Sequence, residues 1–172
     1  MIDCAIDNCA KFDKVERTWL LCSSGKAIES DNNEYWESTD MSQFAGKTAI
    51  ISGGAEGIGF SVAQAVGKQG MNVVLGDIDV DQLSQAKAKL EAQGIEVLTV
   101  QMDVRKQDQW KAAAEQAIER FGKIHMLVNN AGVGGTPGAI EQTDDKDWRW
   151  VLDVNLMGVI YGAEAIVPLM KE

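Results

Sequence analysis

The stretch from Lys47 to Phe60, KTAIISGGAEGIGF, constrains the fold more than any other part of the chain, because an apolar run leads directly into a glycine-rich loop. Residues 48–51 show little alternation of polar and apolar side chains, which is typical of a strand buried on both faces of a parallel sheet. Four glycines follow: Gly53, Gly54, Gly57 and Gly59. Beyond Gly57 the apolar residues recur at helical spacing, so the loop opens onto a helix N-terminus. Free N–H groups and the positive end of the helix dipole favour a pyrophosphate at such a turn.

The glycine spacing is Ser52-Gly53-x-x-x-Gly57-Ile58-Gly59, which fits neither the six-position dinucleotide fingerprint nor the P-loop that ends in Gly-Lys-Ser/Thr. It resembles the Thr-Gly-x-x-x-Gly-x-Gly motif of the short-chain dehydrogenase/reductase family, with serine in place of threonine as the one departure. For this motif taken alone, a glycine-rich turn that serves only the backbone is the alternative interpretation.

Strand-like and helix-like stretches alternate along the chain after residue 47. We predict strands at about 48–51, 72–75, 95–100 and 125–129, and helices at about 58–69, 81–92, 106–121 and 147–170. This alternation implies right-handed crossovers and a parallel sheet. The predicted fold class is α/β, a Rossmann-like doubly wound parallel sheet. By the family resemblance the strand order is 3-2-1-4, and the sheet is incomplete, with only the first four strands and their helices.

The last predicted helix is apolar on nearly every side, so a neighbouring element is expected to cover it. Thr143 is expected to cap this helix, whose first turn then holds Asp144 and Asp145. Gly158 and Gly162 would allow a close approach of that neighbour.

Composition limits the partners that the protein can have. The chain has 172 residues, 45% of them hydrophobic, which is enough for one buried core. A formal charge of −10 argues against a nucleic-acid partner. The apolar stretches are interpreted as too short for a membrane span, and Asp3 and Asp7 occupy the place of a basic signal-peptide start. We therefore expect a cytoplasmic protein that binds no membrane.

The cysteines do not indicate a metal site. Cys4, Cys9 and Cys22 are an odd number with no zinc-like spacing, and no histidine lies near them. Reduced, isolated thiols are the favoured interpretation.

Residues 1–40 differ from the rest of the chain. They hold four basic and nine acidic residues and lack hydrophobic periodicity. We expect a disordered N-terminal extension there, either an appended leader or an over-extended gene start, and a partial dinucleotide-binding Rossmann domain in residues 41–172.

A second motif follows the fourth predicted strand, Asn129-Asn130-Ala131-Gly132. Taken alone it is equally well explained as a strand-ending turn that uses Asn and Gly for left-handed backbone conformations. The family resemblance makes it part of the cofactor site. That resemblance implies cofactor contacts from Ser52, Gly53, Gly57, Ile58, Gly59, Asp77, Asp103, Val104, Asn130, Ala131 and Gly132, with Asp103 and Val104 flanking the adenine.

The expected cofactor is NAD rather than NADP. Asp77 closes the second predicted strand, where a carboxylate accepts hydrogen bonds from a ribose 2′-hydroxyl and repels a 2′-phosphate. Glu56 stands where NADP-preferring relatives often carry a basic residue. A turn or N-cap aspartate is the alternative interpretation of Asp77.

Only part of the family's catalytic set is present. Asn155, in Asp-Val-Asn-Leu-x-Gly, matches the family's catalytic asparagine, and a structural hydrogen bond is the alternative role. Family members use a Ser and a Tyr-x-x-x-Lys pair to exchange a proton with the substrate. Tyr35 and Tyr161 lack a lysine four residues later, so the expectation is a chain truncated before the catalytic Ser and Tyr-x-x-x-Lys.

Two functions from different classes are compatible with these features. The first is an oxidoreductase that transfers hydride between NAD(H) and a small-molecule alcohol or ketone, as a homo-oligomer when complete, with this chain alone inactive. The second is a catalytically silent dinucleotide-binding or interaction module. The substrate is not readable from the sequence, because one family serves many alcohols and ketones.

Overall fold

A computed structural model describes residues 10–14, 17–21, 27–29, 41–135 and 137–171 of the protein. The chain divides into two compact units, Met1–Met41 and Ser42–Glu172. The cysteines lie outside the described residues.

The first unit contains three short antiparallel strands in the order β1-β2-β3. They are β1 (Ala10–Lys14), β2 (Arg17–Leu21) and β3 (Ala27–Glu29). These strands fall within residues 1–40, for which the sequence analysis predicts disorder. The rest of that segment lies outside the described residues, and disorder in the segment as a whole stays a prediction.

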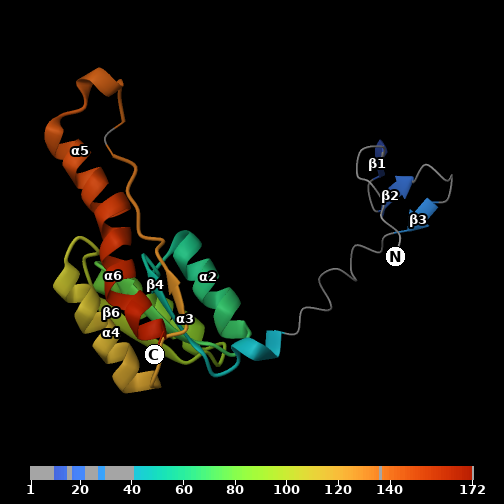
Figure 1. Ribbon diagram of the computed structural model, residues 1–172, viewed down its shortest axis with the longest axis horizontal. Helices are drawn as coiled ribbons and strands as arrows, with labels where there is room; N and C mark the ends of the chain where they lie inside the picture. Colours follow the sequence, from blue (N-terminus) through green and yellow to red (C-terminus); the bar gives the residue numbers. More distant parts are fainter. Residues whose placement is uncertain (1–9, 15–16, 22–26, 30–40, 136, 172) are drawn as a thin grey trace. The chain divides into compact units, whose positions relative to one another are not determined.

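The second unit is built on a four-stranded parallel sheet with the order β6-β5-β4-β7 (Figure 1). Its strands are β4 (Thr48–Ser52), β5 (Asn72–Asp77), β6 (Val97–Gln101) and β7 (Met126–Val128). The order is the predicted 3-2-1-4, and β4 lies at the point where the chain crosses from one side of the sheet to the other. Among the described residues, β7 pairs only with β4.

Helices follow each of the first three strands of this sheet, and a long helical segment follows the fourth. They are α2 (Gly57–Lys68), α3 (Val80–Glu91), α4 (Gln107–Phe121), α5 (Asp145–Leu152) and α6 (Gly158–Lys171), with short 3-10 helices at Met41–Phe44 and Ile140–Gln142. A π-helical turn, Asp153–Met157, joins α5 to α6. The sequence pattern predicts one uninterrupted helix there and does not indicate the π turn.

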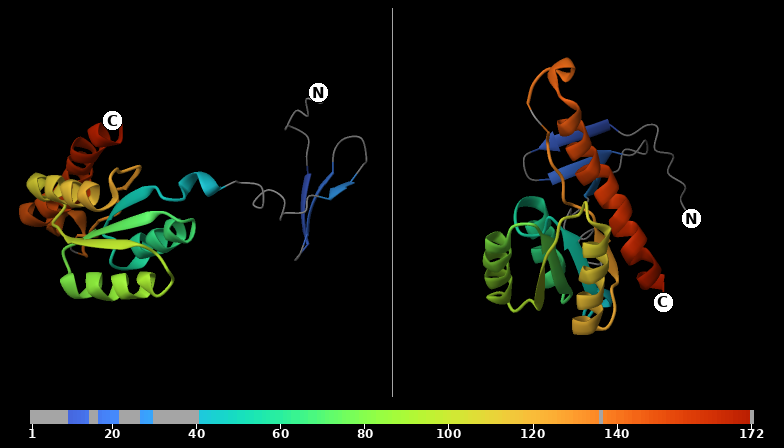
Figure 2. Two further views of the ribbon diagram at one scale, coloured as in Figure 1. Left: turned by 90° about the horizontal axis from the view of Figure 1, so that it is seen from below. Right: turned by 90° about the vertical axis from the view of Figure 1, so that its left-hand side faces the viewer.

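The helices cover both faces of the sheet, as a doubly wound fold requires (Figure 2). Successive residues of a strand point to opposite faces. Ile50 therefore packs with α4 and α6 in one core cluster, whereas Ile51 packs with α2 and α3 in the other. Both isoleucines are fully buried.

The start of α5 differs from the expectation in one residue. The cap is Asp144, whose carboxylate accepts a hydrogen bond from the Asp147 backbone N–H at 2.9 Å. Thr143 lies one position too early, because the helix begins at Asp145. Asp145 lies in the first turn as expected, whereas Asp144 is the cap and not a residue of the turn.

The helical segment Asp145–Lys171 is long and apolar enough to cross a membrane by length and composition alone. The expectation that no apolar stretch reaches this length is therefore wrong. The core helix of a soluble protein can satisfy the same criterion, but such a helix is mostly buried. In this segment only 22% of the most apolar 18 residues are buried. Leu152 and Leu156 are about half exposed, at 49% and 52%.

Candidate functional site

A cavity of about 250 Å³ opens at the carboxyl ends of the parallel strands. In sheets of this kind ligands bind at that edge, where the strand order reverses. The cavity is lined by Gly53, Glu56, Gly76, Asp77, Ile78, Met102, Val104, Asn130, Ala131, Gly132, Val133 and Val154. Six of the predicted cofactor residues are in this set: Gly53, Asp77, Val104, Asn130, Ala131 and Gly132.

Ser52 is buried, does not line the cavity, and joins the two motifs. Its side-chain oxygen accepts hydrogen bonds from the backbone N–H groups of Asn130 (3.1 Å) and Ala131 (3.2 Å). The same hydroxyl donates to the Val128 carbonyl at 3.4 Å. All three bonds require only a hydroxyl, so serine can replace threonine at this position of the motif.

The side chain of Asn130 makes the reciprocal connection. Its amide nitrogen donates to the Ser52 carbonyl at 3.0 Å and to the Gly53 carbonyl at 2.9 Å. These bonds explain why the two motifs, 78 residues apart, form one surface.

The glycine-rich loop is closely packed where it meets Asn130. A Cβ added at Gly59 would lie 2.1 Å from the Gly53 carbonyl oxygen and 2.5 Å from the Asn130 amide nitrogen. Gly53 has a φ of 61°, and a Cβ added there would lie 2.9 Å from the Ala131 Cα. The loop therefore needs glycine at both positions to bring its backbone to the cavity.

The N-terminus of α2 carries no side-chain cap. Glu56 is the N-cap residue, but its carboxylate makes no capping bond and instead lines the cavity. The first N–H groups of α2, which begins at Gly57, thus lack a side-chain partner from the cap residue. Gly57, Ile58 and Gly59 form this first turn and do not line the cavity; Ile58 is 77% exposed.

Asp77 ends β5, and its carboxylate is fixed by two backbone groups. One oxygen accepts a hydrogen bond from the Ala55 N–H at 3.2 Å, and the other accepts from the Asp79 N–H at 3.3 Å. A carboxylate has about four acceptor positions, so two remain for a ligand. The carboxylate is thus held at the cavity with acceptor capacity to spare.

The carboxylate of Asp103 is paired with Arg105. The Arg105 side chain donates to both carboxylate oxygens, with the shortest distance 2.6 Å. This pairing holds the pKa of Asp103 below its ordinary value of 3.8, against partial burial, which acts in the opposite direction. Asp103 does not line the cavity, whereas its neighbour Val104 does.

Asn155 lies in the π-helical turn and clamps a loop. Its side-chain oxygen accepts from the Val133 N–H at 2.8 Å, and its nitrogen donates to the Val133 carbonyl at 2.9 Å. The residue is exposed. Asn155 thus makes structural hydrogen bonds to a loop rather than to the sheet, and its catalytic role stays a prediction.

Five residues of the cavity wall are absent from the site predicted from the sequence: Gly76, Ile78, Met102, Val133 and Val154. Gly76, Ile78 and Met102 lie at the ends of β5 and β6, and the rule that ligands bind at carboxyl ends of strands could have indicated them. Val133 and Val154 reach the cavity through tertiary packing, for which the sequence gives no local signal. Among the described residues, no group of three or more His, Cys, Asp or Glu side chains could hold a metal ion.

Comparison with known proteins connects this geometry to a family. The family model for short chain dehydrogenase matches residues 47–172. The 3-alpha-(or 20-beta)-hydroxysteroid dehydrogenase of Mycobacterium bovis is 43% identical over 127 residues, which cover 74% of this chain and 47% of the relative. The chain spans about half the length of the curated relatives it matches.

Two solved structures with similar folds are complexes with a nicotinamide cofactor. A short chain dehydrogenase/reductase from Burkholderia phymatum in complex with NAD is 42% identical, with a TM-score of 0.71, and the match covers 74% of this chain and 45% of that one. A metagenomic short-chain oxidoreductase in complex with NADP is 31% identical, with a TM-score of 0.70, over 74% of this chain and 57% of that one.

Proposed function

Because the chain belongs to the short-chain dehydrogenase family, we propose that its cavity binds NAD and that the whole protein transfers hydride between NAD(H) and an alcohol or ketone. The observation that carries the proposal is the Asp77 carboxylate, fixed by two backbone N–H groups beside the uncapped start of α2.

The residues present suit a dinucleotide. The first turn of α2 offers N–H donors and a positive dipole end to a pyrophosphate, and the close packing around Gly59 lets the backbone approach it. Within the cavity, Ile78, Met102 and Val104 form an apolar wall that suits a flat base.

The carboxylate of Asp77 favours NAD over NADP. Its remaining acceptor positions suit the two hydroxyls of a ribose, whereas a 2′-phosphate would bring negative charge against negative charge. Glu56 lines the same cavity and adds to that repulsion. Neither carboxylate has a cation within ion-pair distance among the ion pairs of the described residues.

Bound NAD would supply the hydride acceptor, its nicotinamide ring. The described chain supplies binding and orientation, and Asn155, by family resemblance, would support a proton relay. The 172 residues contain no Tyr-x-x-x-Lys pair. We therefore propose that this chain alone has no dehydrogenase activity, because nothing in it replaces the acid/base tyrosine.

The absence of a Tyr-x-x-x-Lys pair from these 172 residues also favours the second candidate, a catalytically silent dinucleotide-binding module. Turnover of an alcohol or ketone by this 172-residue chain would contradict both the silent module and the predicted inactivity. A protein that contains the chain together with a downstream Tyr-x-x-x-Lys segment, and that shows turnover, would support the oxidoreductase.

Calorimetric titration with NAD⁺ and NADP⁺ tests the cofactor assignment. We expect the wild-type protein to bind NAD⁺ more tightly, and Asp77→Ala to reduce or reverse this preference. Asp108→Ala, which removes an exposed carboxylate in the first turn of α4 outside the cavity, is the matched control and should leave the preference unchanged. Tighter binding of NADP⁺ by the wild type would overturn the assignment.

A further inference from the structure

We infer that Trp110 is a positioning residue for the cofactor site, because its buried indole holds Val104 and through it the apolar wall of the cavity. The inference rests on the proposed cofactor binding and adds to it a residue on α4, whose side chain does not line the cavity. The spacing of Trp110 in the sequence is that of an ordinary core residue.

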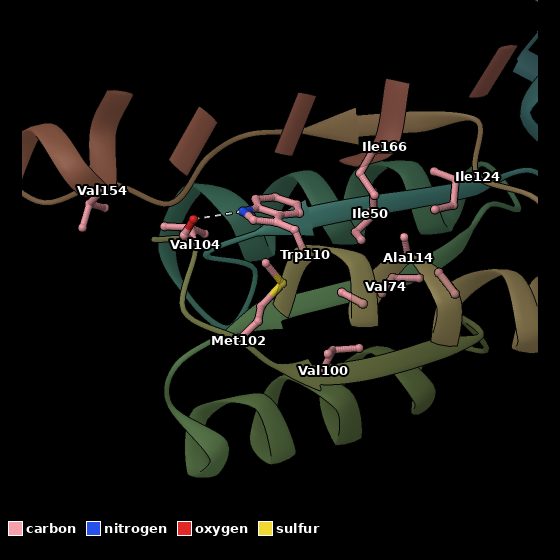
Figure 3. Close-up of a cluster of buried hydrophobic side chains, with 12 residues drawn as sticks. Ile50, Val74, Val100, Met102, Val104, Trp110, Ala114, Ile124, Val154 and Ile166 are labelled. Carbon is pink, nitrogen blue, oxygen red and sulfur yellow. Dashed lines mark hydrogen bonds between the residues drawn. The ribbon is translucent and has the colours of Figure 1, made fainter. Parts of the chain in front are cut away.

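The wall of the cavity is also the surface of a core cluster. Met102, Val104 and Val154 line the cavity and belong to the cluster that contains Trp110 (Figure 3). Any movement of Trp110 is therefore transmitted to side chains that a bound base would contact.

A single hydrogen bond links Trp110 to this wall. The indole Nε1–H donates to the Val104 carbonyl at 3.1 Å, as the dashed line in Figure 3 shows. Trp110 is fully buried and Val104 is 8% exposed. Without the indole this buried carbonyl would lose its donor, which is unfavourable for a buried acceptor.

Helix α6 supports the pair with its two glycines. A Cβ added at Gly158 would lie 2.9 Å from a methyl group of Val104, and one added at Gly162 would lie 2.9 Å from the Trp110 ring. The helix therefore contacts both members of the pair at ordinary van der Waals separation only because these positions lack side chains. Val104 is held by Trp110 through its carbonyl and by α6 against its side chain.

Loss of the indole donor should reduce the fraction of molecules in which the wall is correctly placed. The apparent Kd of a ligand rises in inverse proportion to that fraction. A net hydrogen bond changes an equilibrium by about threefold to tenfold, so we expect the Kd of a ligand that contacts the wall to rise by about that factor.

The variant Trp110→Phe tests this inference, because it keeps an aromatic ring and removes only the donor and the smaller ring. The ligand is ADP-ribose, which contains the base half of the cofactor without the nicotinamide. The matched control is Ile124→Val, since Ile124 is fully buried in the same cluster but does not line the cavity. Binding is measured by calorimetry well below the melting temperature of each variant.

Both variants should lower Tm, but only Trp110→Phe should raise the Kd of ADP-ribose, by about threefold to tenfold. An unchanged Kd in Trp110→Phe, or an equal rise in Ile124→Val, would overturn the positioning role and leave the proposed function intact. A wild-type protein that binds no ADP-ribose would instead refute the proposed function, and this inference with it.

A measurement on the wild type covers the case in which Trp110→Phe does not fold. The indole N–H resonance of Trp110 should shift when the protein is saturated with ADP-ribose, while those of Trp148 and Trp150, which do not line the cavity, serve as internal references. An unshifted Trp110 resonance at saturation would contradict the inference.

Discussion

Replacing Gly59 with alanine should destabilise the protein, although the same change inside most helices is stabilising. Gly59 belongs to α2, and a helical Gly→Ala substitution ordinarily stabilises by roughly 0.5–1 kcal/mol. Here the new methyl group would lie 2.1 Å from the Gly53 carbonyl oxygen, so either the backbone of the loop or the helix must move. The sign of the change in stability therefore shows whether the steric clash or the helix propensity dominates at this position.

The magnitude follows from the contacts that the methyl group would disrupt. Overpacking of this kind costs about 1–3 kcal/mol. The methyl group would also displace the Asn130 side chain, whose two hydrogen bonds contribute roughly 1 kcal/mol each. After the propensity gain is subtracted, we expect a loss of about 2–4.5 kcal/mol in the free energy of unfolding.

Urea denaturation with Gly57→Ala as the matched control tests this reasoning. Gly57 has a φ of 56° but open space around it, so its replacement should cost only the backbone strain, about 1–2 kcal/mol. A Gly59→Ala variant as stable as the wild type, or destabilised no more than Gly57→Ala, would refute the argument that this loop is sterically closed to a side chain.

Three further predictions concern the packing, pH response and assembly of the protein. Ser52→Ala should lower the urea midpoint of unfolding markedly, since it leaves two backbone N–H groups without their acceptor. Ser52→Thr keeps the hydroxyl and should lower the midpoint less. Equal losses in the two variants would contradict the role of the hydroxyl. Partial burial lowers the pKa of His125, as do the nearby charges of Lys47 and Lys123, and its neutral ring accepts the Thr48 N–H at 3.1 Å. Because the unfolded chain binds that proton more readily, the contribution of His125 to stability should be fully present above pH 6.5, the ordinary pKa of histidine. This contribution should be lost as the pH falls below that value. The variant His125→Gln should remove this loss when stability is measured as a function of pH. Exposed apolar residues of α5 and α6, together with an edge of β7 that no described strand pairs with, should make the isolated chain self-associate. A stable monomer in sedimentation velocity would contradict this.

The elements that could be predicted from the sequence are those specified by local periodicity. The β4 run and the helices after it have apolar residues at the spacing of their own secondary structure, and the strand order follows from the family resemblance. The position of Asp77 at the end of its strand is also predicted correctly, because in this fold the ligand-binding residues follow the carboxyl ends of the parallel strands.

The features that could not be predicted are the partners that individual side chains choose. Asn155 bonds to the backbone of Val133, 22 residues away, and no local pattern specifies that partner. Asp103 turns to Arg105, and the indole of Trp110 reaches the Val104 carbonyl, through side-chain orientations that periodicity does not determine. The misplaced cap at Thr143 has a different cause, since Asp144 is an equally good capping residue one position later.

The central claim, that this cavity binds NAD through Asp77 and the glycine-rich loop, is tested most directly by a crystal structure of the protein with NAD⁺. We predict the pyrophosphate at the N-terminus of α2, a ribose hydroxyl donating to the Asp77 carboxylate, and the adenine against Val104. A dinucleotide bound elsewhere, or one whose ribose does not contact Asp77, would contradict the claim.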